Sequence, residues 1–349
     1  MKEAILYKKL TKKNVKCAVC ERRCTIAPGK EGFCGTRYNK EGKLYTLIYE
    51  VVSAINVDPI EKKPLYNFHP GTNVFSIGSL GCNFRCKHCQ NWNISFVKVT
   101  PPDAHFESHL YTPAEIVKMA KAEKCQGIAF TYNEPTIWLE YVLDVAKLAK
   151  KEKLFTVFVT NGYITPEALD KIGPFIDAFR VDIKGFSNKT YKKLANIPDF
   201  EKILEVTKRA KKKWKMHIEC VTNIIPTIND GEKELSSIAS WIKNELGKDT
   251  PWHVTRFHPS AKLIDLPETP IETLEIAYAI GMREGLNFVY FGNIGNHPKE
   301  NTYCPNCQKE IITRDTYHIR FSGISGEKCI YCDEKISIIN KKKIENIIK

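Results

Sequence analysis

The chain predicts an α/β fold, a partial or full (β/α) barrel with a small cysteine-rich domain at each end. Three observations predict it: strand-like and helical patterns alternate through the middle, the alternation stops after Asn301, and eleven of the thirteen cysteines fall into three tight groups. Alternating strands and helices form parallel sheets, because each helix crosses back over the sheet before the next strand begins. We expect an N-terminal four-cysteine domain over 1–55, the barrel over 56–298 and a C-terminal domain over 299–349.

The barrel elements follow from apolar periodicity. Strand-like runs lie at 74–78, 127–132, 154–160, 177–183, 215–221, 252–257 and 287–291. Helical patterns lie at 113–124, 137–151, 165–173, 201–213, 232–247 and 270–285. Thr112 and Thr165 each precede a proline and are expected to cap a helix. Active-site residues of such a barrel belong at the carboxyl ends of its strands.

The flanking segments have their own predictions. Residues 17–50 are expected to form a small cysteine knot with a hairpin that turns at Glu41-Gly42. Residues 56–73, rich in proline and polar side chains, are expected to be a linker that wraps the core. The C-terminal cysteines frame a short strand-rich stretch, and a lysine-rich helical tail follows it.

Composition limits the location and the role of the cysteines. The sequence contains no apolar run of 18 residues and no signal-peptide core, so we expect a cytoplasmic protein without membrane association. Tight cysteine groups in such a chain indicate metal or iron–sulfur clusters rather than disulfides. Cys125 and Cys220 stand apart and are expected to be buried apolar side chains.

The central cysteine group follows the strand-like run at 74–78 and reads Cys82-x3-Cys86-x2-Cys89. Three thiolates on a cubane of four irons leave one iron without a protein ligand. S-adenosylmethionine (SAM) can chelate that iron through its amino and carboxylate groups, which is chemistry supplied by the cofactor and positioned by the protein. A three-ligand zinc site, or a cluster whose fourth ligand comes from elsewhere, is the alternative.

The segment GCNFRCKHCQNW resembles the signature of the radical SAM superfamily. Over residues 17–305 the chain resembles the AmmeMemoRadiSam system radical enzymes, which are relatives of the pyruvate formate-lyase activating enzymes. The shared segments are CxxCxxxC with GFCGTR, NVDPIEKKPLYNFHPG, FTYNEPTI, TNGY, VDIKG, NIIPTIND, PWHVTRFHPS and GNIGNHPKENTYCPNC. The resemblance implies a radical SAM barrel, an oxidoreductase-type enzyme with a [4Fe-4S] cluster and SAM, and cooperation with AMMECR-type and Memo-type proteins. A flavodoxin or ferredoxin type of electron donor is expected with it.

The same resemblance proposes cofactor-binding residues. TYNEP at 131–135 resembles a Gly-Gly-Glu-Pro element that binds the methionine amino group, and Tyr132-Asn133 replaces its two glycines, so backbone contacts there are expected to differ. VDIKG resembles an Asp-Leu-Lys element, and RFHP resembles a segment with a ribose-contacting histidine. The proposed cofactor-binding residues are Asn133, Glu134, Asn161, Asp182, Lys184 and His258. Asn223 and Pro226 are expected in a loop over the site, and His253 is expected to be a core histidine rather than a proton donor.

Two further cysteine groups are predicted to bind metal. Cys304, Cys307, Cys329 and Cys332 form two Cys-x2-Cys knuckles, which predict a closed tetrahedral zinc site, with iron as the alternative. Such a site holds together a domain that lacks a core, and a role in gripping RNA or a partner stays open. The N-terminal group suits structural zinc, which we favour, or a second cluster that relays electrons. Its members are Cys17, Cys20, Cys24 and Cys34.

Three functions remain open at this point. The first is hydrogen abstraction from an unactivated C–H bond by a 5′-deoxyadenosyl radical, to modify an RNA or a small metabolite. RNA is considered because residues 1–50 carry 12 Lys and Arg against 5 Asp and Glu, although a solvated lysine-rich surface explains this equally well. The second is formation of a glycyl radical on a partner protein, and the third is a non-catalytic iron–sulfur and zinc protein that binds or transfers electrons.

Overall fold

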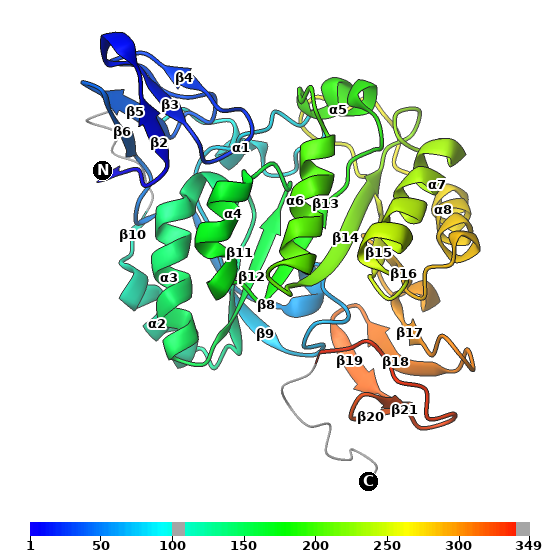
Figure 1. Ribbon diagram of the computed structural model, residues 1–349. Coiled ribbons are helices and arrows are strands. Elements are labelled where there is room, and N and C mark those ends of the chain that lie inside the picture. Colours follow the sequence, from blue (N-terminus) through cyan, green and yellow to red (C-terminus); the bar gives the residue numbers. More distant parts are fainter. Residues whose placement is uncertain (100–108, 340–349) are drawn as a thin grey trace.

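The computed structural model describes residues 1–99 and 109–339. Its centre is one eight-stranded sheet in which seven strands run parallel in chain order (Figure 1). The parallel strands are β9 (Asn73–Gly78), β11 (Gly127–Phe130), β12 (Phe155–Thr160), β13 (Ala178–Asp182), β14 (His217–Ile224), β15 (Trp252–Arg256) and β16 (Val289–Gly292). Within the described residues no ladder joins β16 back to the opposite edge, so the sheet is a partial (β/α) barrel, as predicted.

The eighth strand corrects the prediction of a linker over 56–73. Strand β8 (Ala54–Pro59) pairs antiparallel with β9 at the edge of the sheet, with Ile55 opposite Ile77. The expected boundary between residues 55 and 56 falls inside this strand. A short 3₁₀ turn, η2 (Ile60–Lys62), follows β8, and Leu65 and Phe68 are buried in an apolar cluster against the sheet rather than wrapped around it. The prediction is wrong for residues 56–59, because edge strands tolerate the polar residues and proline that otherwise indicate a loop.

The helices cover one face of the sheet (Figure 1). They are α1 (Trp92–Ser95), α2 (Pro113–Ala122), α3 (Leu139–Lys151), α4 (Pro166–Ile172), α5 (Asn188–Ala195), α6 (Glu201–Lys212), α7 (Glu232–Trp241) and α8 (Ile271–Glu284). Shorter turns are η1 (Thr11–Lys13), η3 (Pro135–Trp138), η4 (Gly173–Phe175), η6 (Pro298–Glu300) and the π-helical η5 (Ile242–Leu246) that extends α7. The six predicted helices are confirmed, whereas α1 and α5 were not predicted.

The two predicted helix caps are present. The Thr112 hydroxyl accepts a hydrogen bond from the Glu115 amide at 3.3 Å, and the Glu115 carboxylate accepts one from the Thr112 amide at 2.7 Å. The Thr165 hydroxyl accepts from the Ala168 amide at 3.1 Å. These bonds satisfy amide groups that the first turn of a helix leaves without a partner.

Two small sheets precede the barrel and lie beside the carboxyl ends of its strands (Figure 1). Their strands are β1 (Lys2–Glu3), β2 (Tyr7–Lys9), β3 (Val15–Cys17), β4 (Thr25–Ile26), β5 (Arg37–Lys40) and β6 (Lys43–Thr46). The predicted hairpin is confirmed, because β5 and β6 pair across Glu41 and Gly42, which have φ angles of 51° and 87°. Cys20 bridges to Ile164 just beyond the carboxyl end of β12, which places the N-terminal cysteines beside that end of the sheet. A separate pair joins β7 (Val51–Val52) to β10 (His109–Leu110).

The C-terminal strands lie at the opposite end of the barrel (Figure 1). They are β17 (Thr302–Tyr303), β18 (Glu310–Asp315), β19 (His318–Phe321), β20 (Ile324–Ser325) and β21 (Lys328–Cys329). Arg314 donates to the Tyr66 carbonyl at 3.0 Å, and Asn67 donates to the Ser337 carbonyl at 3.0 Å, so this segment packs on the chain that enters β9. Residues 340–349 of the predicted lysine-rich helical tail lie outside the described residues. Within 1–99 and 109–339, no helix combines the length and apolar character needed to cross a membrane.

Candidate active site and metal centres

A cavity of about 440 Å³ lies at the carboxyl ends of the parallel strands. Each of the seven strands, or the loop that follows it, contributes to the lining. The lining includes Cys82, Cys86 and Cys89 after β9, Asn133 and Glu134 after β11, Asn161 after β12, Asp182 and Lys184 at and after β13, Asn223 in β14, Thr255 in β15 and Asn293 after β16. The fold therefore brings together the polar strand ends that the sequence predicted, with the exception of His258.

The three-cysteine loop (residues 81–89) is held by its neighbours. Gly81 has a φ of 81°, and a Cβ there would lie 2.5 Å from the Thr36 methyl carbon, so only glycine fits. Arg85 donates to the Cys82 carbonyl at 2.7 Å, and the Ser260 hydroxyl donates to the Cys89 carbonyl at 3.2 Å. These contacts fix the backbone and leave three thiols directed at one cavity, which is the donor set for three irons of a cubane.

Glu134 is buried, with 1% of its surface exposed, and the surrounding chain donates three hydrogen bonds to its carboxylate. Its oxygens accept from the Thr160 hydroxyl at 2.6 Å, the Thr136 amide at 3.0 Å and the Asn161 amide at 2.8 Å. Burial raises the pKa of Glu134, and these hydrogen bonds oppose the rise. The Asn161 side chain donates to the Asn83 side-chain oxygen at 2.8 Å, so the end of β12 is tied to the three-cysteine loop.

Tyr132 and Asn133 stand where the resembling element has two glycines, and both fix neighbouring segments. Tyr132 adopts a φ of 71°, and its hydroxyl donates to Asp58 at 2.7 Å. The Asn133 side chain accepts from the Ser79 amide at 3.0 Å and donates to the Gly81 carbonyl at 2.9 Å. Asn133 therefore ties the end of β9 to the end of β11.

The Asp182 carboxylate lies between two cations. Lys184 Nζ is 2.9 Å from Asp182 Oδ2, and Arg180 binds the other carboxylate oxygen. Burial alone would raise the pKa of Asp182, but Arg180 and Lys184 lower it to about 2. Burial alone would lower the pKa of Lys184, and the charge of Asp182 raises it instead. Both groups are therefore charged at neutral pH.

Three further cations line the same cavity, and sequence reasoning missed them: Lys62, Lys63 and Arg180. Arg180 donates to the Lys63 carbonyl at 2.6 Å, and the Lys63 ammonium lies 2.6 Å from Asp58. Burial lowers the pKa of Lys63 to about 8, although Asp58 opposes the shift. For Lys62 and Lys63 the signal was the EKKP stretch at 61–64, which was interpreted as part of a linker that wraps the core.

Other predicted histidine and cysteine positions lie away from the cavity. His258 contacts the Asn293 carbonyl at 3.0 Å and Glu268 at 3.3 Å, and it does not line the cavity. His253 is a buried core histidine as predicted, with Nε2 2.6 Å from Glu219. Cys125 and Cys220 are both buried, as expected.

Comparison with known proteins identifies the family. The Radical SAM superfamily matches residues 76–242, which contain the three-cysteine loop and strand ends β9 to β14. "Uncharacterized protein MJ0808" of Methanocaldococcus jannaschii is 43% identical over 341 residues, which cover 97% of this chain and 100% of that protein. The chain belongs to the radical SAM superfamily.

One further relative and one solved structure of described function also match this radical SAM protein. The pyruvate formate-lyase-activating enzyme of Clostridium pasteurianum is 25% identical over 208 residues, which cover 56% of this chain and 82% of that enzyme. A solved radical SAM methyltransferase from Sphaerobacter thermophilus has a TM-score of 0.48 and 14% identity, and the match covers 65% of this chain and 68% of that one. Membership of the superfamily implies a [4Fe-4S] cluster and SAM, and the three thiols in the cavity fit that cluster.

The radical SAM protein has a second cysteine site, the ribbon site (Cys304, Cys307, Cys329 and Cys332). Its four sulfurs all lie within 4.8 Å of one another, and Cys304–Cys332 and Cys307–Cys329 are 3.6 and 3.7 Å apart. Four thiolates at 2.3 Å from one zinc ion would lie roughly 3.8 Å apart. The group is therefore able to bind one metal ion, and it lies at the end of the barrel opposite the cavity.

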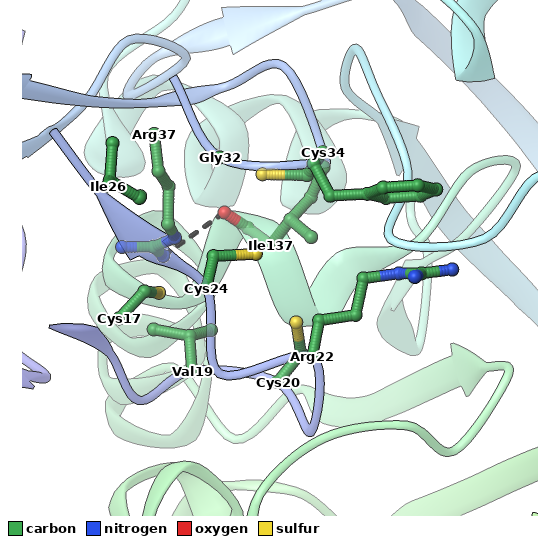
Figure 2. Close-up of a pocket in the computed structure, with 11 residues that line it drawn as sticks. Cys17, Val19, Cys20, Arg22, Cys24, Ile26, Gly32, Cys34, Arg37 and Ile137 are labelled. Carbon is green, nitrogen blue, oxygen red and sulfur yellow. Dashed lines mark hydrogen bonds between the residues drawn. The ribbon is translucent and has the colours of Figure 1, made fainter. Parts of the chain in front are cut away.

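The third cysteine group of the radical SAM protein, the N-terminal site (Cys17, Cys20, Cys24 and Cys34), surrounds a small cavity of about 10 Å³ (Figure 2). The cavity is also lined by Val19, Ile26, Arg22, Arg37 and Ile137. Cys24 is half-buried and the other three are buried. The group therefore presents four thiols to an enclosed and largely apolar space.

Proposed function

We propose that this radical SAM protein is an enzyme that abstracts a hydrogen atom from an unactivated C–H bond of a small anionic metabolite. The observation that carries the proposal is the cavity at the carboxyl ends of the strands, lined by Cys82, Cys86 and Cys89 together with six cationic or carboxylate side chains. When bound there, the cluster and SAM supply a 5′-deoxyadenosyl radical by reductive cleavage of SAM.

The residues of the chain would position SAM. The Glu134 carboxylate, held by Thr160 and Asn161 at the end of β12, suits the methionine amino group, and the Asp182 carboxylate suits a ribose hydroxyl or an amine. Asn133 would act by holding the loop before Cys82 in place. His258 would contact the ribose only after a change in its surroundings, because it does not line the cavity.

The charges around the cavity support an anionic substrate. Lys62, Lys63, Arg180 and Lys184 line it. Asp182 is the acidic partner of Arg180 and Lys184, and Asp58, which is not in the lining, is the partner of Lys62 and Lys63. Ammonium and guanidinium groups in a partly desolvated cavity favour carboxylate or phosphate groups. A cavity of about 440 Å³ that also has to hold SAM favours a small metabolite over RNA.

Cleavage of SAM tests the proposal. The chain is reconstituted anaerobically with iron and sulfide, reduced with dithionite and incubated with SAM, and 5′-deoxyadenosine is measured. We expect formation of 5′-deoxyadenosine by the native chain and by Cys125→Ala, a buried cysteine outside the cavity, and none by Cys86→Ala. Equal formation by Cys86→Ala would overturn the proposal. Retention of RNA by the chain at low salt would favour the RNA alternative.

A second function is supported by the similarity to the pyruvate formate-lyase-activating enzyme of Clostridium pasteurianum. In that case the hydrogen would come from a glycine α-carbon of a partner protein. Incubation with candidate partners would then produce an electron paramagnetic resonance doublet on the partner. The AMMECR-type and Memo-type proteins implied by the sequence resemblance are the first candidates as companions, and a flavodoxin or ferredoxin as electron donor. Metabolite turnover without any partner would exclude this function.

A further inference from the structure

The N-terminal site differs from the ribbon site in how its sulfurs are spaced. All four ribbon sulfurs lie within 4.8 Å of one another, as one zinc ion requires. Among the described residues, neither the N-terminal site nor the three-cysteine loop forms such a compact group. In a cubane each thiolate binds a different iron, so its sulfurs lie farther apart than sulfurs on one ion. Neither of these two groups therefore has the compact arrangement that one zinc ion requires.

The space between the N-terminal sulfurs also favours a cubane over a single zinc ion. Figure 2 shows the four sulfurs placed around the pocket rather than meeting at one point. The pocket, about 10 Å³, admits a water-sized sphere of 1.4 Å radius. A tetrahedral zinc site has no such room, because each sulfur lies only about 2.3 Å from the centre. A cubane fills a larger space, since irons and sulfides lie between its centre and the thiolates.

We propose that Cys17, Cys20, Cys24 and Cys34 hold a second [4Fe-4S] cluster that passes electrons to the cluster of the three-cysteine loop. This assignment replaces the zinc that the spacing in the sequence favoured. Four thiolates give every iron a protein ligand, so the second cluster has no open iron for SAM. Its available chemistry is therefore the transfer of single electrons.

The two cysteine loops are in direct contact. A Cβ on Gly81 would lie 2.7 Å from the Cys34 carbonyl oxygen, so the backbones of the two loops touch. Arg85 donates to the Cys82 carbonyl at 2.7 Å and to the Phe33 carbonyl at 2.9 Å. Gly81 directly precedes Cys82, so the contact joins a cysteine of each site. The Arg85 side chain links the two backbones by hydrogen bonds.

A second arginine reinforces this contact. Arg22, from the N-terminal site, donates to the Asn83 carbonyl at 2.5 Å, and its guanidinium stacks on the Phe33 ring at 3.4 Å. The ribbon site has no comparable position, because it lies at the amino ends of the strands. The N-terminal site is therefore placed where an electron can pass to the cluster beside the cavity.

The electron balance of the relay is simple. A low-potential one-electron donor protein of the flavodoxin or ferredoxin class is oxidised, and the N-terminal cluster is reduced by one electron. That electron then reduces the cluster of the three-cysteine loop, and the N-terminal cluster returns to its oxidised state. No bond forms or breaks at the N-terminal site. The relay, though not the metal assignment, rests on the proposed function.

Metal counting tests the assignment. The full chain is reconstituted anaerobically, and iron and zinc are measured separately. We expect about eight irons and about one zinc per chain, and about four irons in the triple variant Cys82→Ala/Cys86→Ala/Cys89→Ala. Mössbauer spectra of the triple variant should show a [4Fe-4S] cluster. Two zinc ions per native chain, with no iron in the triple variant, would overturn the assignment.

Two measurements test the relay. In the fully reduced native chain the two paramagnetic clusters should broaden each other's electron paramagnetic resonance signals, and the triple variant should give the unbroadened spectrum of one cluster. Cys24→Ala should lose at least tenfold in 5′-deoxyadenosine formation driven by a donor protein and should retain formation driven by dithionite. Cys220→Ala is the matched control. Uncoupled signals in the native chain would overturn the relay even if Cys24→Ala fails to fold. If the native chain forms no 5′-deoxyadenosine with either the donor protein or dithionite, the proposed function is contradicted instead.

Discussion

Arg37 and Glu140 form a bidentate ion pair that joins the N-terminal sheets to helix α3. Arg37 Nη1 lies 3.0 Å from Glu140 Oε1, and Nη2 lies 2.8 Å from Oε2. Both side chains are at most 2% exposed. Since Arg37 also lines the N-terminal site, this pair fixes that site relative to the barrel.

Breaking this pair should destabilise the protein strongly. Arg37→Ala leaves the Glu140 carboxylate buried without its cation, which costs roughly 3–5 kcal/mol. Thermal unfolding under anaerobic conditions should show a midpoint several degrees lower for Arg37→Ala. Lys13→Ala, which breaks an exposed ion pair with Glu41, should leave the midpoint nearly unchanged. An unchanged midpoint for Arg37→Ala would show that the pair does not hold the two parts together.

Acid should destabilise the fold through Glu219. Burial alone would raise its pKa, but hydrogen bonds from His217 and His253 lower it to about 2, below the usual 4.5. Because the folded-state pKa is the lower one, the stabilisation is complete above about pH 4.5 and is lost as the pH falls towards 2. Urea midpoints from pH 7 to pH 3 should fall more steeply for the native chain than for Glu219→Gln. Parallel curves for the two proteins would contradict this origin of the acid sensitivity.

The ribbon site should bind structural metal that is separate from catalysis. Cys307→Ser should remove about one zinc ion per chain, lower the thermal midpoint by several degrees and leave the iron content unchanged. The iron content should not change because the ribbon packs on Tyr66 and Asn67 at the amino ends of the strands, at the end of the barrel opposite the cavity. Inductively coupled plasma mass spectrometry checks both metals in one sample. A loss of iron instead of zinc would assign iron to the ribbon.

Much of this organisation could be predicted from the sequence, and the exceptions have physical reasons. Apolar runs predicted all seven parallel strands, because a strand covered on both faces needs continuous hydrophobic residues. Strand β8 was missed because an edge strand tolerates polar residues, and with it the sequence reasoning lost Lys62 and Lys63 as residues of the cavity.

The identity of the metals depends on distances that spacing in the sequence does not contain. Cys304-x2-Cys307 and Cys17-x2-Cys20 have the same local spacing, yet only the first belongs to a group with all sulfurs within 4.8 Å. Cys34 lies in the loop before β5, which touches the three-cysteine loop at Gly81, and this is a tertiary contact. His258 could be placed on a strand end, but its contact with Glu268, across a loop, could not be predicted.

Glu134 should contribute directly to SAM affinity. Glu134→Gln keeps the shape of the side chain but removes its charge, so a charge-assisted hydrogen bond to the methionine ammonium becomes a weaker neutral one. With the cluster reconstituted, calorimetric titration with SAM should show a Kd about tenfold higher for the variant, equivalent to about 1.4 kcal/mol.

The matched control for this substitution is Glu123→Gln, an exposed residue at the end of α2. It should bind SAM like the native chain. Equal affinity of all three proteins would mean that the Glu134 carboxylate only holds Asn161 and Thr160 in place.

The N-terminal surface should make reduction by a donor protein sensitive to salt. Eight exposed lysines lie on it: Lys8, Lys9, Lys12, Lys13, Lys16, Lys30, Lys40 and Lys43. An acidic donor would be steered to this surface, and screening shortens the range of that attraction to about 10 Å at 0.1 M ionic strength. Stopped-flow reduction by an acidic ferredoxin should therefore slow several-fold between about 50 and 300 mM salt, because salt weakens the electrostatic steering that raises the association rate. The variant Lys8→Gln/Lys9→Gln/Lys16→Gln should be slower at low salt and less sensitive to salt, and its reduction by dithionite should match that of the native chain. If the native chain and the variant respond to salt alike, the donor docks elsewhere on the molecule.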